Sequence, residues 1–241
     1  MFDLEDFAFA GMTQVGADLR KLGVGAESME EVGNRIVRYL YDHFTSKTSR
    51  QRGCVLVRLF KTHSFGELDE ELRQFVTPLL HGTPASPEVK CLTLLATAGE
   101  RQEWNSRRTS DRHKAIPLAS EAAIENSPMI SQLFSQLGLS FSALQRPDPL
   151  LMMDTGQSSF NVFYIPNAQG SPYVPAQKEF VTPYGVKSVV GFGGLLPTGD
   201  FFAVILFSRV HIRRESAELF KTLALSTRLA LVSVAKTRVF A

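Results

Sequence analysis

Residues 186–234 constrain the fold of this chain more than any other stretch. Residues 186–196 are rich in β-branched side chains and glycines, residues 197–200 have the composition of a tight turn, and residues 201–207 are continuously apolar. Two such strands joined by a short turn predict a β-hairpin. Beyond Ser208, apolar positions recur every three or four residues, which places them on one face of a helix. The positions on this face are Phe220, Leu223, Ala224, Thr227, Ala230, Leu231 and Val234.

The same patterns predict the elements that precede the hairpin. Helices are expected at residues 4–22, 28–44, 65–80 and 120–137, and strands at residues 54–60, 89–96, 116–118 and 160–165. Ser28 and Glu31 have the spacing of a capping box, and Pro128 interrupts the fourth helix. Because strands and helices do not alternate regularly, we expect an α+β fold. Its mainly antiparallel sheet would have about six strands, with the N- and C-terminal helices packed on one face.

Composition is that of an ordinary globular domain. The chain has 241 residues, of which 44% are hydrophobic and 21% charged, enough for one domain with a substantial core. Its formal charge of +2 is spread along the sequence, so we expect neither nucleic acid nor a membrane as partner. The first six residues are acidic where a signal peptide would be basic, which predicts a cytoplasmic protein. In that reducing compartment, Cys54 and Cys91 are expected to be buried thiols.

The predicted hairpin, its glycines and the following helix resemble the last part of a GAF domain, the small-molecule-sensing module of signalling proteins. The resemblance covers residues 28–234. Residues 173–177 (Tyr-Val-Pro-Ala-Gln) and 189–194 (Val-Val-Gly-Phe-Gly-Gly) are also similar to sensory regions that precede bacterial histidine kinases and cyclases. The resemblance implies a GAF/PAS-like sheet, a signalling and dimerisation helix in residues 1–27, and a sensory domain with an output helix in residues 28–241. It further implies a non-catalytic function, in which a small ligand or cofactor of unknown identity controls an effector such as a histidine kinase.

The first candidate ligand site lies beside a long proline-rich loop. Residues 166–183 contain four of the twelve prolines, which disfavour a strand or helix and stiffen the segment. Aromatic side chains flank this loop, so we expect a cavity between it and the sheet. The cavity would be bordered by Phe163, Tyr173, Tyr184 and Phe192. The alternative is a loop that simply wraps the surface.

A second candidate ligand site is the polar stretch at residues 104–114, which begins with the only tryptophan. Trp104 and Arg108 would clamp an anionic ligand, and His113 would be the axial ligand if a haem were bound. A charged, solvated surface loop is the alternative for all three residues. The cyclic-nucleotide signature of GAF domains is absent from the sequence. The five histidines do not have zinc-site spacing, so we expect no metal site.

One short motif favours an enzyme instead. Residues 151–156 read Leu-Met-Met-Asp-Thr-Gly, which is similar to the active-site turn of aspartic proteases, where two such carboxylates share a proton. Because the sequence has one copy of this motif, a second chain would have to supply the other carboxylate. Asp154 would then belong to a dimeric aspartic-protease-like hydrolase. The alternative for this motif is a local turn, and the third functional class is a ligand-free protein-interaction module.

The predicted terminal helices carry apolar side chains on more than the one face that can pack against the sheet of a single domain. The surplus positions are Leu219, Leu225, Leu229 and Val232 on the C-terminal helix, with Met12, Val15, Leu19 and Leu22 on the N-terminal helix. We expect these stripes to form a homodimer. The alternative is that the N-terminal helix covers the second stripe within one chain.

Overall fold

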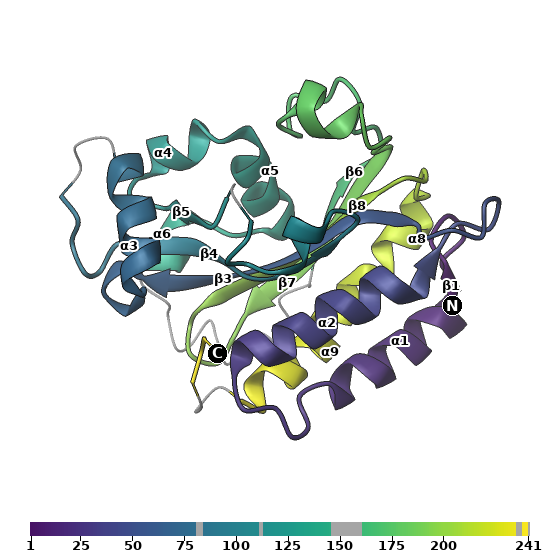
Figure 1. Ribbon diagram of the computed structural model, residues 1–241, viewed down its shortest axis with the longest axis horizontal. Coiled ribbons are helices and arrows are strands. Elements are labelled where there is room, and N and C mark those ends of the chain that lie inside the picture. Colours follow the sequence, from purple (N-terminus) through teal and green to yellow (C-terminus); the bar gives the residue numbers. More distant parts are fainter. Residues whose placement is uncertain (81–83, 111–112, 146–160, 235–237, 241) are drawn as a thin grey trace.

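A six-stranded antiparallel sheet forms the centre of the fold (Figure 1). The computed structural model describes residues 1–80, 84–110, 113–145, 161–234 and 238–240. The strands in their order across the sheet are β5 (Ala115–Pro117), β4 (Lys90–Gly99), β3 (Cys54–Ser64), β8 (Phe201–Ser208), β7 (Ser188–Leu195) and β6 (Val162–Ile165). Every neighbouring pair is antiparallel, which confirms the predicted α+β class and strand number. Two short strands, β1 (Phe2–Asp3) and β2 (Phe44–Thr45), pair separately in parallel.

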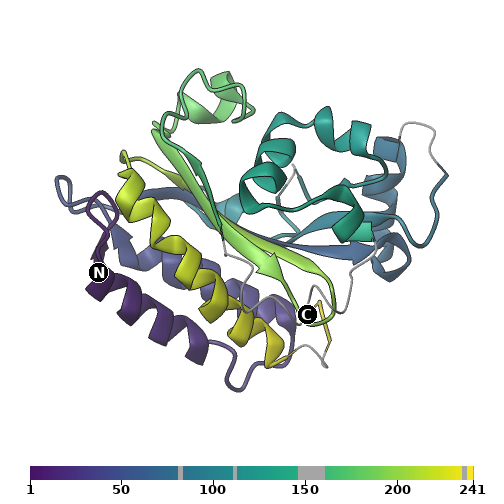
Figure 2. The same ribbon diagram turned by 180° about the vertical axis from the view of Figure 1, so that it is seen from behind.

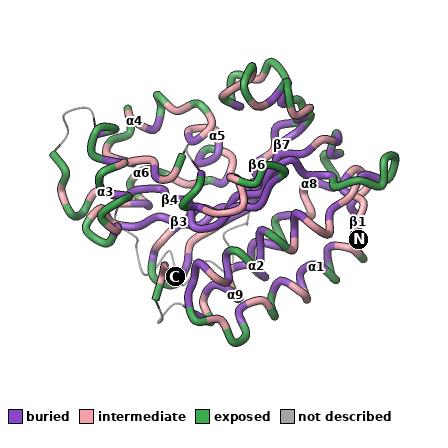
Figure 3. Tube along the Cα trace, viewed as in Figure 1, coloured by how far each residue is buried: buried purple, intermediate pink, exposed green. Residues whose placement is uncertain are grey.

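Helices cover both faces of the sheet (Figures 1 and 2). One face carries α1 (Phe9–Lys21), α2 (Met29–His43), α8 (Arg214–Glu218) and α9 (Phe220–Val232). The opposite face carries α4 (Glu121–Glu125), α5 (Pro128–Leu137), α6 (Phe141–Gln145) and the 166–183 loop, and α3 (Glu70–Val76) packs at the β5 edge. The strands between the two layers are buried along most of their length (Figure 3). The terminal helices therefore lie together on one face, as predicted.

The β7–β8 hairpin forms where the sequence predicts it. Its ladder runs in register from Ser188 opposite Ser208 to Leu195 opposite Phe201. Glycine is required within this ladder, because a Cβ on Gly193 would lie 2.2 Å from the backbone oxygen of Phe202. The glycine at this position therefore permits the close approach of the two strands.

The helical layer over the first face also follows the predicted pattern. All seven apolar positions predicted for the helix that follows the hairpin are buried. The α1 helix packs against α9 and buries Met12, Val15 and Leu19 within the same chain. By contrast, Leu225 and Leu229 on α9 stay 46% and 49% exposed. The N-terminal helix thus covers much of the surplus apolar surface without a second copy.

One predicted helix differs from the structure, and one predicted break is confirmed. Pro128 separates α4 from α5, as expected. The stretch at residues 65–80 is a 3₁₀ turn at Phe65–Glu67, then α3, then a second 3₁₀ turn at Thr77–Leu80. The helical ladder cannot continue through Pro78, which has no N–H, and α3 starts anew at its N-cap Asp69. Leu68, Leu72 and Val76 of the predicted stripe are nevertheless buried.

Candidate functional site: a cavity on the sheet

A cavity of about 460 Å³ lies on the sheet face opposite α1, α2 and α9. Its sheet-derived lining consists of Leu56, Arg58, Phe60, Leu92, Ile116, Ile205 and Phe207. Residues of the 101–113 stretch, the start of α5 and the 166–183 loop form the walls. A concave, largely apolar site of this volume has the size and lining typical of small-molecule sites in proteins.

Arg58 brings a positive charge to the floor of the cavity. It lies within β3, opposite Thr97 on β4 and Ile205 on β8. The residue is only 8% exposed, and its Nη2 donates a hydrogen bond to Ser110 Oγ at 3.0 Å. A guanidinium stays protonated even when buried, so this charge is permanent. Arg58 was not among the predicted site residues, although it is the one charged residue in the apolar stretch 54–60.

An aromatic wall stands beside the floor. The ring centroid of Trp104 lies 4.8 Å from that of Tyr184 and 5.5 Å from that of Phe180, which in turn contacts Phe207 at 5.2 Å. Arg101 lies over the Trp104 ring at 5.7 Å. These edge-on and tilted contacts join the 101–105 turn to the 166–183 loop, and they give the cavity an aromatic, apolar side.

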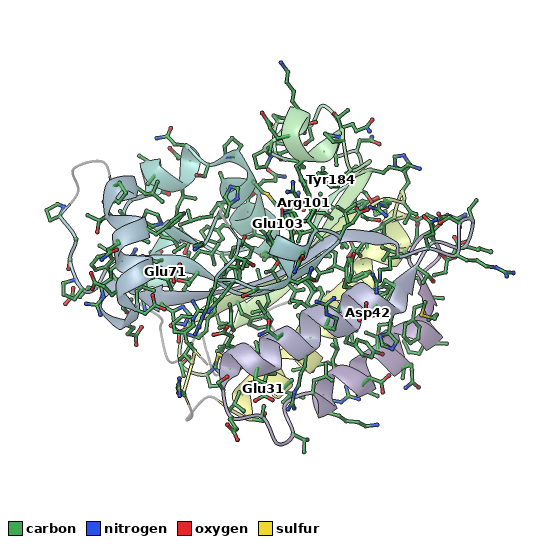
Figure 4. All side chains as sticks on the ribbon, in the orientation of Figure 1. Glu31, Asp42, Glu71, Arg101, Glu103 and Tyr184 are labelled. Carbon is green, nitrogen blue, oxygen red and sulfur yellow. The ribbon has the colours of Figure 1, made fainter. Side chains whose placement is uncertain are left out.

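Arg101, Glu103 and Tyr184 form a polar cluster at the rim of this wall (Figure 4). Arg101 Nη1 donates to the Tyr184 hydroxyl at 3.2 Å, and its guanidinium pairs with the Glu103 carboxylate. The hydrogen bond to Tyr184 and the contact with Glu103 raise the pKa of Arg101. The cluster is solvent-accessible, so its charges are largely screened.

The 166–183 loop owes its shape to one glutamine as well as to its prolines. The Gln177 side-chain amide donates to the backbone oxygens of Ala168 and Val174 at 2.9 and 2.8 Å, and its Oε1 accepts from Gly170 N at 2.9 Å. The chain then makes one π-helical turn, Gln177–Val181. These bonds fix the loop against its own backbone, which holds Phe180 at the cavity.

The start of α5 forms the facing wall. Ser127, Pro128, Met129 and Ile130 all line the cavity. Pro128 occupies the first turn of the helix, and the Ser127 side chain does not cap it. The first N–H groups of a helix have no partner within the helix, and they carry the positive end of its dipole.

Some of the predicted ligand-binding residues line the cavity, and others lie outside it. Trp104 and His113 line the cavity, and His113 has a left-handed backbone with φ of 59° at an exposed position. Tyr184 supports the wall through Trp104. Arg108 and Tyr173 are exposed and do not belong to the described lining.

Two predicted aromatic residues lie away from the cavity. Phe163 is fully buried in β6, where its ring would be 3.1 Å from a Cβ added to Gly191. The expected position of Phe192 is corrected: it lies on the other face of the sheet and contacts Phe220 of α9, with ring centroids 6.0 Å apart. Side chains alternate between faces along a strand, and a fully apolar strand does not reveal which face is which.

The remaining predicted features concern Asp154, the metal-ligating residue types and the two cysteines. Asp154 and its motif lie outside the described residues. Within the described part of the chain, His, Cys, Asp and Glu side chains do not gather in groups of three or more that could hold a metal. Cys54 and Cys91 are free and buried, and burial raises the pKa of each thiol to about 12.

Comparison with known proteins does not assign the chain to a family. No family model and no curated protein matches the sequence. None of the helices in the described ranges is both long and apolar enough to cross a bilayer.

Proposed function

We propose that this chain is a GAF-like, non-catalytic sensory domain that binds a small molecule in the cavity and controls an effector such as a histidine kinase. The observation that carries the proposal is the cavity of about 460 Å³ on the sheet face opposite the terminal helices. This matches the arrangement expected of a GAF domain, with terminal helices on one face of an antiparallel sheet and the ligand pocket on the other.

The sheet offers a short physical connection between the cavity and the terminal helices. Ile205 and Phe207 of β8 line the cavity, while the alternating residues Val204 and Leu206 belong to the core under α9. A ligand that displaces β8 by a fraction of an ångström would therefore act on both layers, because packed cores transmit strain. We propose that α9 carries this change to the effector.

Mass spectrometry of the purified protein tests the proposal. An absorption spectrum of the native protein would first be recorded to detect haem, flavin or bilin. The protein would then be denatured and its small molecules extracted. We expect a compound that is enriched in the wild type over a Met129→Trp variant, whose larger side chain occupies the cavity at the start of α5. Leu79→Trp, at a 39% exposed position outside the cavity lining, is the matched control and should retain the compound. Identical extracts from wild type and Met129→Trp would argue against the proposal.

A further inference from the structure

Residues 238–240 dock against the start of α2 through their backbone (Figure 1). The N–H of Met29 donates to the carbonyl oxygen of Arg238 at 3.0 Å. The N–H of Glu30 likewise donates to the carbonyl oxygen of Val239 at 2.8 Å. These are the first two N–H groups of the helix, which have no partner within it. The 238–240 segment therefore caps α2 from outside the helix.

The ring of Phe240 covers the imidazole of His63 in β3. The two ring centroids lie 5.2 Å apart, and the guanidinium of Arg107 lies over the Phe240 ring at 4.4 Å. Phe240 also packs against the apolar core under α2 and α9 and against the smaller cluster beside α3. His63 is buried with this ring in place, and neither of its nitrogens makes a hydrogen bond with the described residues. Departure of the 238–240 segment would therefore uncover a buried imidazole that lacks hydrogen bonds.

The charged groups around His63 disfavour a proton on its ring. The ionisable residues on the elements around His63 and Phe240 are Lys61, Lys90, Cys91, Asp200, Glu30, Asp69, Arg107 and Arg238. Asp200 would attract the proton, but Lys61 and Lys90 already share this carboxylate at 2.8 and 3.6 Å. The carboxylates of Glu30 and Asp69 lie 2.9 and 3.6 Å from the Arg107 guanidinium. A protonated His63 would thus be a further buried cation without an acceptor at either nitrogen.

This environment links docking of the 238–240 segment to pH. Burial, reinforced by the Lys61 charge, lowers the pKa of His63 to about 3, whereas an exposed imidazole has a pKa of about 6.5. Between these two values the released form binds a proton and the docked form does not. Docking is therefore strongest above about pH 6.5 and weakens as the pH falls. From pH 7 to pH 5 the equilibrium should shift toward release by about 25-fold.

We propose that the 238–240 segment is a latch that acid releases, with His63 as the group that senses the proton. The docked latch attaches the chain that follows α9 to the start of α2 and to β3. Its release would change how the chain beyond the proposed output helix is held. The latch does not include the cavity, so it does not depend on the proposed ligand.

Amide hydrogen exchange of the full chain, measured by NMR between pH 5 and pH 7, tests the latch. The N–H groups of Met29 and Glu30 report docking directly, because their acceptors belong to the 238–240 segment. Dividing each rate by that of the unfolded chain at the same pH removes the intrinsic pH dependence of exchange. We expect opening at both amides to increase about 25-fold from pH 7 to pH 5. At each pH it should exceed the opening at Leu59 in the buried centre of β3, which exchanges through global unfolding.

Variants assign this response to His63 and Phe240. His63→Leu should make the opening independent of pH to within about twofold, because the titrating group is gone, while the exposed control His211→Leu keeps the wild-type response. Phe240→Ala should increase opening at the two reporter amides at least about tenfold at pH 7, because the ring loses its apolar contacts. The N–H of Glu31, which Ser28 Oγ accepts, should stay nearly unchanged in that variant.

Three results would overturn the latch. The first is opening at Met29 and Glu30 that does not change with pH in the wild type, and the second is an equal pH response in His63→Leu. The third is opening of the two amides only together with Leu59, because the segment then has no release of its own. If His63→Leu does not fold, the wild-type profile and Phe240→Ala still decide. Each of these results leaves the proposed ligand-binding function intact.

Discussion

The imidazole of His63 is buried in β3 at 2% exposure, and among the described residues neither ring nitrogen has a hydrogen-bond partner. Its ring lies 5.2 Å from that of Phe240. Burial, reinforced by the nearby Lys61 ammonium, lowers the pKa of His63 to about 3. The neutral imidazole is therefore the form that fits the folded core, and unfolding restores an ordinary affinity for a proton.

This depressed pKa predicts loss of stability in acid. The contribution of His63 is complete above the unfolded pKa of about 6.5 and is lost progressively as the pH falls toward 3. Between pH 7 and pH 5 it should lower the free energy of unfolding by about 2 kcal/mol. Urea unfolding of the wild type and His63→Leu across this range measures the difference, with the exposed His211→Leu as control. Parallel pH profiles for wild type and His63→Leu would refute the prediction.

Lys61 and Asp200 form an ion pair between β3 and the β7–β8 turn. Lys61 Nζ lies 2.8 Å from Asp200 Oδ2, and the lysine side chain is 6% exposed. Burial acts to raise the pKa of the Asp200 carboxyl, but the charge and hydrogen bond of Lys61, with the Thr198 hydroxyl and the Lys90 charge, together lower it. The Asp200 carboxyl is therefore ionised in the folded protein at neutral pH.

Removing one charge of the Lys61–Asp200 pair should lower the free energy of unfolding more than removing one charge of a surface pair. Asp200→Asn leaves the Lys61 ammonium buried without its counter-charge, so we expect a loss of about 3–5 kcal/mol in the free energy of unfolding. Asp42→Asn, which breaks the more exposed pair with Arg52 at 2.8 Å, should cost at most about 1 kcal/mol. Denaturant titration compares the two, and equal losses would show that burial does not set the strength of the Lys61 pair.

At the scale of single elements, helix caps provide a matched test. Ser28 Oγ accepts a hydrogen bond from Glu31 N at 3.1 Å and caps α2, whereas the Ser127 side chain does not cap α5. Ser28→Ala should therefore lower the free energy of unfolding by about 1 kcal/mol, and Ser127→Ala should change it by less than about 0.5 kcal/mol. Thermal and urea unfolding measure both. A larger loss for Ser127→Ala would contradict the assignment of the caps.

The elements that sequence predicts well are those with strong local signals. The turn at residues 197–200, the Pro128 break and the Ser28 cap all act through neighbouring backbone groups, and each appears where expected. Residues 65–80 do not form one continuous helix. An apolar stripe indicates which positions are buried, and it does not show that the helical hydrogen bonds continue through the segment. Leu72 and Val76 are buried although the helix around them is short.

Local sequence patterns do not predict which residues line the cavity. The loop position was predicted, and the cavity does lie against Pro172 and Pro175 of that loop. The residues that form the floor of the cavity are not predicted. The strands β3 and β8 carry apolar side chains on both faces, and only their pairing decides which residues face α5. The predicted position of Phe192 is wrong because β7 also packs apolar side chains on both of its faces. The prediction omits Arg58, although its charge interrupts an apolar strand.

For the whole molecule, the homodimer stays a prediction that now depends on α9. The α1 stripe is covered within the chain, and Leu19 is fully buried, so a charge there would disrupt the core. Leu225 and Leu229 are one helical turn apart and about half exposed, and we expect them to pack against a second copy.

Light scattering tests this dimer. The wild type should have the mass of a dimer, and Leu225→Glu with Leu229→Glu should yield a monomer of unchanged melting temperature, because both side chains are exposed. Leu79→Glu, at a 39% exposed position away from α9, should leave the dimer intact. A wild-type monomer at every concentration would end the dimer hypothesis without affecting the cavity.

A small molecule bound in the cavity would stabilise the folded state, so ligand-dependent thermal unfolding is the decisive measurement. The melting of the wild type and of Met129→Trp would be followed against a panel of small aromatic compounds. A ligand at one hundred times its dissociation constant stabilises the folded state by about 2.7 kcal/mol, which should raise the melting temperature by about 5 °C or more in a chain of this length. We predict such a shift for at least one compound in the wild type and its loss in Met129→Trp. Equal shifts in both proteins, or none in the wild type across the panel, would contradict it.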